Sequence, residues 1–219
     1  QRQMCIRDRI WNVKKINSLF LTHAHFGHVD GLGLFGRETM NARGISLYCS
    51  EKMVDLIERT PNWSILLSQG VFLPNTVKLV NLPGVSVEAI RVPHRAELSD
   101  MHAYLIKANK TLLFLPDHDT WHETLGDHNL RSWLNHLEVD IALIDGTFYT
   151  SDELKHRSQE EVPHPPVEQT LEMLGKKREG DGRVVFIHLN HTNRLCRDDS
   201  PVTTMGWEVG KEGDIYNLT

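Results

Sequence analysis

Short apolar runs that end in a polar residue recur along this chain, and they restrict its fold more than any other feature. Each run is four to eight residues long, rich in Val, Ile, Leu or Phe, and bounded by Gly, Pro, Asn or Asp, which is typical of β-strands. Asn109-Lys110 predicts a hairpin turn between two of the runs. The expected strands are 18–21, 45–49, 77–81, 85–92, 103–107, 111–115, 140–144 and 184–189.

Segments with helical character separate these strands. Ser50 directly precedes one of them, where a serine hydroxyl caps a helix by accepting a backbone hydrogen bond. Strands mixed with helices, with hairpins in the middle of the chain, predict an α/β fold in which sheets are flanked by helices. The expected helices are 31–36 and onward, 51–59, 130–136 and 167–177.

The composition excludes several classes of protein. The chain has 219 residues, enough for one domain with a buried core, and its 40% hydrophobic content and net charge of −5 exclude disorder. The longest apolar runs fall far below the roughly 18 residues that a membrane span needs. The three cysteines are too scattered for a disulfide framework or a cysteine zinc site. Mild acidity argues against nucleic acid as a partner, because proteins that bind it carry basic surfaces.

Histidine is the unusual part of the composition, with 13 residues, three of them within a span of six. His23 and His25 follow an apolar strand and are two positions apart, so in extended backbone they share one face. His28 comes after a turn that Gly27 permits, where a helix is expected to open. Three imidazoles at a strand-to-helix turn favour a divalent metal site. The alternative is three unrelated polar histidines in a loop.

Four further strands end in residues that can bind a metal. Side chains at strand ends along one edge of a sheet are how α/β folds assemble a site. Asp117 follows Phe-Leu-Pro and is best placed to bridge two metals, because a carboxylate offers one oxygen to each. The four residues are His94, Asp117, Asp145 and His188.

The Thr-His-x-His-x-x-His motif at 22–28, followed in order by His94, Asp117 and His188, resembles the metallo-β-lactamase superfamily. The resemblance extends from residue 18 to the C-terminus. Segments 143–149 (Leu-Ile-Asp-Gly-Thr-Phe-Tyr) and 186–193 (Phe-Ile-His-Leu-Asn-His-Thr-Asn) resemble the branch of pyrroloquinoline quinone biosynthesis protein B. That branch is related to the tRNA 3′-processing endonucleases. The resemblance implies a four-layer αββα sandwich with a metal site at one edge between two sheets.

The resemblance also implies a set of metal ligands. The expected cofactor is zinc, as one or two ions, with iron or manganese as alternatives. One position departs from the family: the superfamily usually has Asp before the last histidine of the first motif, and this chain has Gly27. The second metal is therefore expected to bind more weakly. The implied ligands are His23, His25 and His94 for the first metal and His28 and His188 for the second, with Asp117 bridging both.

Two further residues receive roles through the resemblance. His164 lies in the loop that supplies an active-site histidine in the tRNA-processing relatives, where it donates a proton to the leaving group. An imidazole that titrates near physiological pH suits that role. Asp145 aligns with an acidic residue that positions an active-site histidine in those relatives. The alternatives are an exposed loop histidine and a turn residue before Gly146.

The N-terminus does not fit the family. Residues 1–9 (Gln-Arg-Gln-Met-Cys-Ile-Arg-Asp-Arg) have no apolar stretch after their charges, so they do not form a signal peptide. They resemble a translated sequencing adaptor, with a native helix start as the alternative. The first strand with metal-binding residues also comes early for the family. We expect residues 1–9 to be a non-native leader and 10–219 to be a metallo-β-lactamase domain that lacks N-terminal strands.

The expected function is that of a metallo-hydrolase. A divalent metal lowers the pKa of water toward about 7, and no Ser or Cys lies in a nucleophile motif such as G-x-S-x-G. The expected substrate is a small molecule with an ester, phosphodiester or related bond, and the expected location is cytoplasmic. Two alternatives stay open: an iron-dependent oxygenase-like enzyme of pyrroloquinoline quinone biosynthesis, and a non-catalytic metal-binding remnant.

Overall fold

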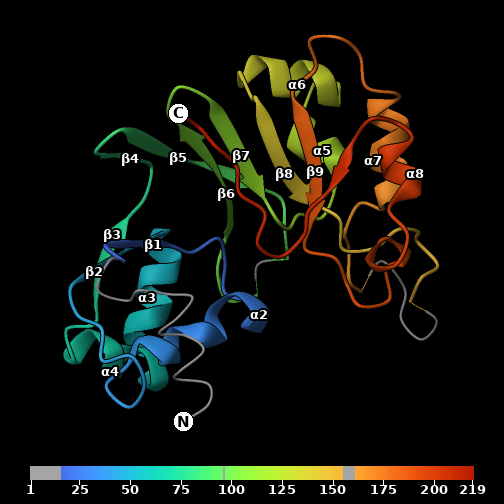
Figure 1. The fold of residues 1–219 in the computed structure, drawn as a ribbon. Coiled ribbons are helices and arrows are strands. Elements are labelled where there is room, and N and C mark those ends of the chain that lie inside the picture. The colour runs from blue at the N-terminus through green and yellow to red at the C-terminus, as the bar shows by residue number, and fades with distance from the viewer. Residues whose placement is uncertain (1–15, 96, 155–160) are drawn as a thin grey trace. The chain divides into compact units, whose positions relative to one another are not determined.

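The computed structural model describes residues 16–95, 97–154 and 161–219 (Figure 1). The expected leader, residues 1–9, lies outside the described residues. The chain divides into two compact units, each of which is described by itself. Of the described residues, the first unit comprises 16–78 and 97–102, and the second comprises 79–95, 103–154 and 161–219.

The first unit contains a three-stranded sheet in the order β1-β2-β3, in which neighbouring strands are parallel. Ile45 and Leu47 of β2 are buried with Met53 and Ile57 of α3 in one apolar core. Helix α3 begins after Ser50, whose hydroxyl accepts a hydrogen bond of 3.2 Å from the backbone N–H of Met53, as the sequence predicts. The elements are β1 (Ser18–Phe20), α2 (Phe26–Val29), the 3-10 helix η2 (Asp30–Phe35), β2 (Ile45–Cys49), α3 (Glu51–Arg59), α4 (Pro61–Ser68) and β3 (Phe72–Thr76).

The second unit contains a seven-stranded sheet in the order β10-β9-β8-β7-β6-β5-β4, of which Figure 1 labels β4 to β9. Strands β7 to β10 are parallel, whereas β6 pairs with β7 and β4 pairs with β5 in antiparallel fashion. The strands are β4 (Leu79–Leu82), β5 (Val85–Val92), β6 (Met101–Lys107, of which the first two residues belong to the first unit), β7 (Thr111–Leu115), β8 (Ile141–Asp145), β9 (Arg183–Ile187) and β10 (Glu208–Val209). The helices are α5 (Trp121–Leu125), α6 (Leu130–His136), α7 (Val167–Leu174), η3 (Arg194–Cys196) and α8 (Ser200–Thr203).

The centre of this second sheet places the residues of interest. Strands β7, β8 and β9 have near-continuous apolar sequences, and most of their side chains are buried, as expected for parallel strands covered on both faces. Because neighbouring parallel strands end at the same edge of a sheet, the residues that follow these three strands lie near one another. Among the described residues, no helix has the length and apolar character needed to cross a membrane.

Most predicted elements form where the sequence places them, and the differences have physical reasons. β2, β5, β7, α3 and α6 have the predicted bounds. The segment from residue 31 is a 3-10 helix preceded by the short α2, because Gly31 and Gly33 disfavour an α-helix. α7 ends at Leu174, short of the prediction, since Gly175 has a φ of 60°. The sequence does not predict β3, because Pro74 and Asn75 are poor strand formers.

Candidate metal centre

Three histidines of the first unit lie around the turn from β1 into α2. His23 follows the strand and is 2% exposed, His25 occupies the position before the first residue of α2, and His28 lies within that helix. The ring centroids of His23 and His25 are 4.6 Å apart, and those of His23 and His28 are 4.2 Å apart. The structure therefore brings together the three imidazoles of the sequence motif.

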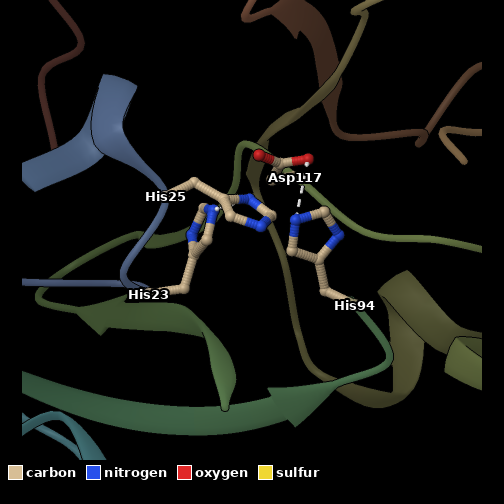
Figure 2. A group of neighbouring side chains, drawn as sticks. All are labelled: His23, His25, His94 and Asp117. Atoms are coloured by element: carbon tan, nitrogen blue, oxygen red, sulfur yellow. Dashed lines mark hydrogen bonds and ion pairs between the residues drawn. The ribbon is translucent and has the colours of Figure 1, made fainter. Parts of the chain in front are cut away.

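The nitrogens of two of these rings face each other. His23 Nε2 and His25 Nδ1 are 3.0 Å apart (Figure 2), and on its other side His23 Nδ1 shares a hydrogen bond of 3.0 Å with the Thr22 hydroxyl. Two nitrogens bound to one tetrahedral zinc ion at 2.0–2.1 Å would be about 3.3 Å apart. The two rings share a hydrogen bond at 3.0 Å, which is within about 0.3 Å of that spacing, so both nitrogens could bind one ion.

A second segment of the first unit contacts residues 23–28, which we call the histidine loop. The backbone N–H of Ala24 donates a hydrogen bond of 3.0 Å to the Ser99 hydroxyl. His25 Nε2 lies 3.2 Å from a carboxylate oxygen of Glu97. Since the hydrogen bond of an imidazole determines which nitrogen carries the proton, Glu97 favours the His25 tautomer that presents Nδ1 to His23.

In the second unit, the predicted residues follow four strands. The buried carboxylate of Asp117, 2% exposed, lies among them. Its Oδ1 is 3.7 Å from His94 Nε2 (Figure 2), and its Oδ2 is 3.9 Å from His188 Nε2. His164 Nδ1, from the loop before α7, is 3.0 Å from Asp117 Oδ1. His94 is therefore near one oxygen of Asp117 and His188 is near the other. This arrangement is compatible with a carboxylate that offers one oxygen to each of two metals.

His94 is held in a defined orientation by Asp119. His94 Nδ1 lies 2.8 Å from Asp119 Oδ1, and the His94 side chain is buried. Because the carboxylate accepts the Nδ1 proton, the lone pair of the ring is on Nε2, which is the nitrogen nearest Asp117. A carboxylate behind a histidine in this way is typical of metal sites.

His188 is oriented by a comparable contact. Its Nδ1 lies 2.8 Å from the hydroxyl of Thr147, and that hydroxyl donates a hydrogen bond of 2.7 Å to Asp145 Oδ1. The hydroxyl therefore accepts the Nδ1 proton of His188, which leaves Nε2 to face Asp117. The backbone of His188 has a φ of 60°, a region that residues other than glycine rarely adopt and that is enriched at functional sites.

Asp145 is buried, and each of its two carboxylate oxygens accepts two hydrogen bonds. Its Oδ1 accepts from the backbone N–H and the hydroxyl of Thr147, at 2.8 and 2.7 Å. Its Oδ2 accepts from the backbone N–H of His118 at 3.2 Å and from His164 Nδ1 at 2.8 Å. This carboxylate therefore fixes the position of His164 and also supports the Thr147 hydroxyl behind His188.

His164 is 5% exposed, so it is not the solvent-exposed loop histidine of the alternative interpretation. Burial opposes its charged form, but the hydrogen bond to Asp145 and the charges of Asp145 and Asp117 outweigh burial and raise the pKa of His164. Ligand atoms of these three residues all lie within 4.8 Å of one another. The geometry of this group alone therefore permits two roles for His164, a proton carrier or a metal ligand.

Three contacts around these residues were not predicted. Asp119 and Thr147 each lie two positions after a predicted aspartate, at Asp117-x-Asp119 and Asp145-x-Thr147, and this spacing is the signal that could have identified them. His118 is fully buried against Trp121, with ring centroids 4.3 Å apart. Burial lowers the pKa of His118 to about 4, so its ring is neutral at neutral pH.

Comparisons of the sequence identify related proteins. The family model described as the beta-lactamase superfamily domain matches residues 3–189. A relative named coenzyme PQQ synthesis protein B, from Methylococcus capsulatus, is 24% identical in an alignment of 231 positions, gaps included, that covers 90% of this chain and 72% of that protein. A relative of the same name from Azotobacter vinelandii is 35% identical in an alignment of 89 positions, gaps included, that covers 36% of this chain and only 30% of that protein.

Solved structures share the fold at low sequence identity. The metallo-beta-lactamase fold protein YhfI from Bacillus subtilis has a TM-score of 0.63 and 13% identity, with coverage of 94% of this chain and 78% of that chain. A diphosphatase from the PhnP family has a TM-score of 0.59 and 18% identity, with coverage of 97% and 74%. An isothiocyanate hydrolase from Delia radicum gut bacteria has a TM-score of 0.57 and 16% identity, with coverage of 92% and 77%.

These likenesses confirm the predicted fold class, a mixed α/β fold with two sheets of the metallo-β-lactamase type. Because their sequences are only 13–18% identical to this chain, these solved structures establish the fold and not the function. The family model covers most of the chain, and the curated relatives agree with the branch that the sequence segments around Asp145 and His188 resemble. The chain therefore belongs to the β-lactamase superfamily, in the branch that resembles coenzyme PQQ synthesis protein B.

Proposed function

We propose that this chain is a metal-dependent hydrolase that cleaves an ester, phosphodiester or related bond of a small molecule. The arrangement around Asp117 carries the proposal: two imidazoles, each anchored through Nδ1, present Nε2 to this buried carboxylate at 3.7 and 3.9 Å. Ligation by imidazole needs a fixed tautomer, which the Nδ1 contacts of His94 and His188 favour. Membership of the superfamily supports the same function.

The proposed ligands are five imidazoles and one carboxylate. Imidazole and carboxylate donors suit zinc, and they also suit manganese or iron. The assignment follows the order of the motifs in the superfamily. We assign His23, His25, His94 and Asp117 to one metal, and His28, His188 and Asp117 to a second.

The remaining residues of the site would move and hold protons. A divalent metal, when bound, polarises the bond under attack and lowers the pKa of water. Asp145 holds His164 through Nδ1, so Nε2 is the nitrogen through which His164 exchanges a proton with a substrate. His164 also lines a cavity of about 490 Å³ in the second unit, where it can meet a leaving group. We assign proton donation to His164 and its positioning to Asp145.

A small molecule is favoured over nucleic acid as the substrate. The chain has a net charge of −5, whereas binding of a nucleic acid backbone depends on clustered Lys and Arg. Solved proteins of this fold include a diphosphatase and an isothiocyanate hydrolase, names that refer to different bonds, so the fold alone does not select the bond.

A substrate screen tests the proposed function. Zinc-loaded and manganese-loaded protein is assayed with p-nitrophenyl esters, bis-p-nitrophenyl phosphate and a lactone, beside the same protein after chelation. We expect turnover of at least one of these substrates that depends on the metal. Protein that binds metal but turns over none of them would contradict the proposal.

Oxidation is the second candidate function, because the relatives are named for coenzyme PQQ synthesis. The same imidazole and carboxylate donors suit iron. Metal analysis of protein purified without added metal separates the two candidates. Zinc or manganese together with hydrolytic turnover supports hydrolysis, whereas iron together with oxygen consumption supports oxidation.

Gly27 provides a test of the second metal site. Its φ lies outside the left-handed region, and an added Cβ would meet no atom within 4 Å, so an aspartate fits here without strain. Gly27→Asp should raise the affinity for the second metal by about 10–100-fold, the range over which groups around a metal site change affinity. Titration of metal-free protein should give one tight equivalent in the wild type and two in the variant.

The matched control for this variant is Gly33→Asp. Gly33 likewise has open space at its Cβ position and no positive φ, but it is not in the histidine motif. We expect this control to bind metal as the wild type does. Two equally tight equivalents in the wild type would show that another residue already replaces the missing carboxylate.

A further inference from the structure

A cavity of about 330 Å³ opens in the first unit beside the histidine loop. All of its described lining residues belong to this unit. The imidazole of His28 and the backbone of Gly31 form one part of the wall. The rest of the wall is apolar and consists of Leu19, Leu21, Leu32, Leu34, Phe35 and Met40.

The wall restricts the chemistry of the group that the cavity can hold. Among the described lining residues, His28 has the only side chain that forms strong hydrogen bonds. A polar group against the remaining wall would lose its hydrogen bonds to water without replacement, which is unfavourable. An apolar group would instead remove its surface from water. The volume of about 330 Å³ also lies within the range of about 300–1,000 Å³ that is usual for small-molecule sites.

His28 gives the cavity a polar end. Its ring packs 4.2 Å from the ring of His23, so His28 belongs both to the histidine loop and to the cavity wall. When the apolar group of a ligand fills the cavity, the bond that joins this group to the rest of the ligand therefore lies next to His28. We propose that the cavity binds the acyl chain of a carboxylic ester substrate, an inference that rests on the proposed function, in which His28 holds a metal.

The first test is the dependence of hydrolysis on acyl chain length. Zinc-loaded protein is assayed with p-nitrophenyl acetate, butanoate and hexanoate. Each methylene that enters the cavity should raise kcat/KM about fourfold, which corresponds to about 0.8 kcal/mol per buried methylene. A series in which kcat/KM stays flat or falls from acetate to hexanoate would overturn the proposal.

Two glycines of η2 provide a variant and its matched control. Gly31 and Gly33 are both exposed, neither has a positive φ, and a Cβ at either position meets nothing within 4 Å. Only Gly31 lines the cavity. Gly31→Phe should lower the hexanoate-to-acetate ratio of kcat/KM at least tenfold, whereas Gly33→Phe should keep the wild-type ratio. An equal reduction in both variants would mean that the cavity does not determine chain-length preference.

A binding measurement separates this proposal from the proposed function. The fluorescent apolar probe N-phenyl-1-naphthylamine is titrated into metal-free protein. We expect binding to the wild type and to Gly33→Phe, displacement by hexanoate, and at least tenfold weaker binding to Gly31→Phe. This pattern without hydrolysis of any ester would reject the proposed function and retain the apolar binding site. Ester hydrolysis without probe binding would overturn the cavity proposal and retain the hydrolase.

Discussion

The His94→Ala variant should lose most of its bound metal and, with it, nearly all hydrolytic activity. The imidazole of His94 is buried, its Nδ1 is held by Asp119, and its Nε2 faces Asp117 at 3.7 Å. Alanine removes a ligand outright, so the loss of metal affinity should exceed the 10–100-fold that is typical when only a supporting residue is changed. The measurement is metal content by mass spectrometry after gel filtration, together with kcat/KM.

The control for this variant is His122→Ala. His122 is exposed on α5 and belongs to none of the groups of possible ligands in the described part of the chain. It should therefore keep the metal content and activity of the wild type. A His94→Ala protein that binds metal as tightly as this control would mean that His94 is not a ligand.

The His164→Ala variant should lower kcat by about 10²–10⁴-fold, the usual contribution of a general acid, while its metal content stays near that of the wild type. The reason is geometric. Asp145 holds His164 through Nδ1, and the ring lines the cavity of the second unit. The measurement is the same pair of assays, metal content and steady-state kinetics, so that loss of metal and loss of turnover are separated.

The contrary result for His164 would also be informative. Its Nδ1 lies 2.8 Å from Asp145 and 3.0 Å from Asp117, a spacing that a cation between the three residues could also use. If His164→Ala loses as much metal as His94→Ala, then His164 is a ligand and the assignment of proton donation is wrong.

The positions of the predicted ligands could be read from the sequence because each is tied to an element with a strong local signal. β5, β7, β8 and β9 are recognisable apolar runs, and a residue just beyond such a run lies at an edge of the sheet. The histidine motif is local as well, since His23 and His25 lie between β1 and α2 and His28 lies within α2. Both signals depend on neighbours in the sequence.

The contacts that orient these residues could not be predicted in the same way. The tautomer of His188 depends on its contact with the Thr147 hydroxyl, and the orientation of that hydroxyl depends on Asp145. Asp145 is the last residue of β8, whereas His188 follows β9. The cavity beside His28 is lined by Leu19 of β1 and by residues of η2. These features depend on packing between different elements, and no periodic pattern encodes them.

The most direct test of the central claim is the metal dependence of hydrolysis by the wild-type protein. Protein purified without added metal is analysed for bound ions, treated with a chelator, and assayed before and after zinc is returned. We predict at least one tightly bound divalent ion per chain, loss of turnover on chelation, and recovery when zinc is added. Full turnover by protein shown to be free of metal, or failure to bind zinc above background, would contradict the account.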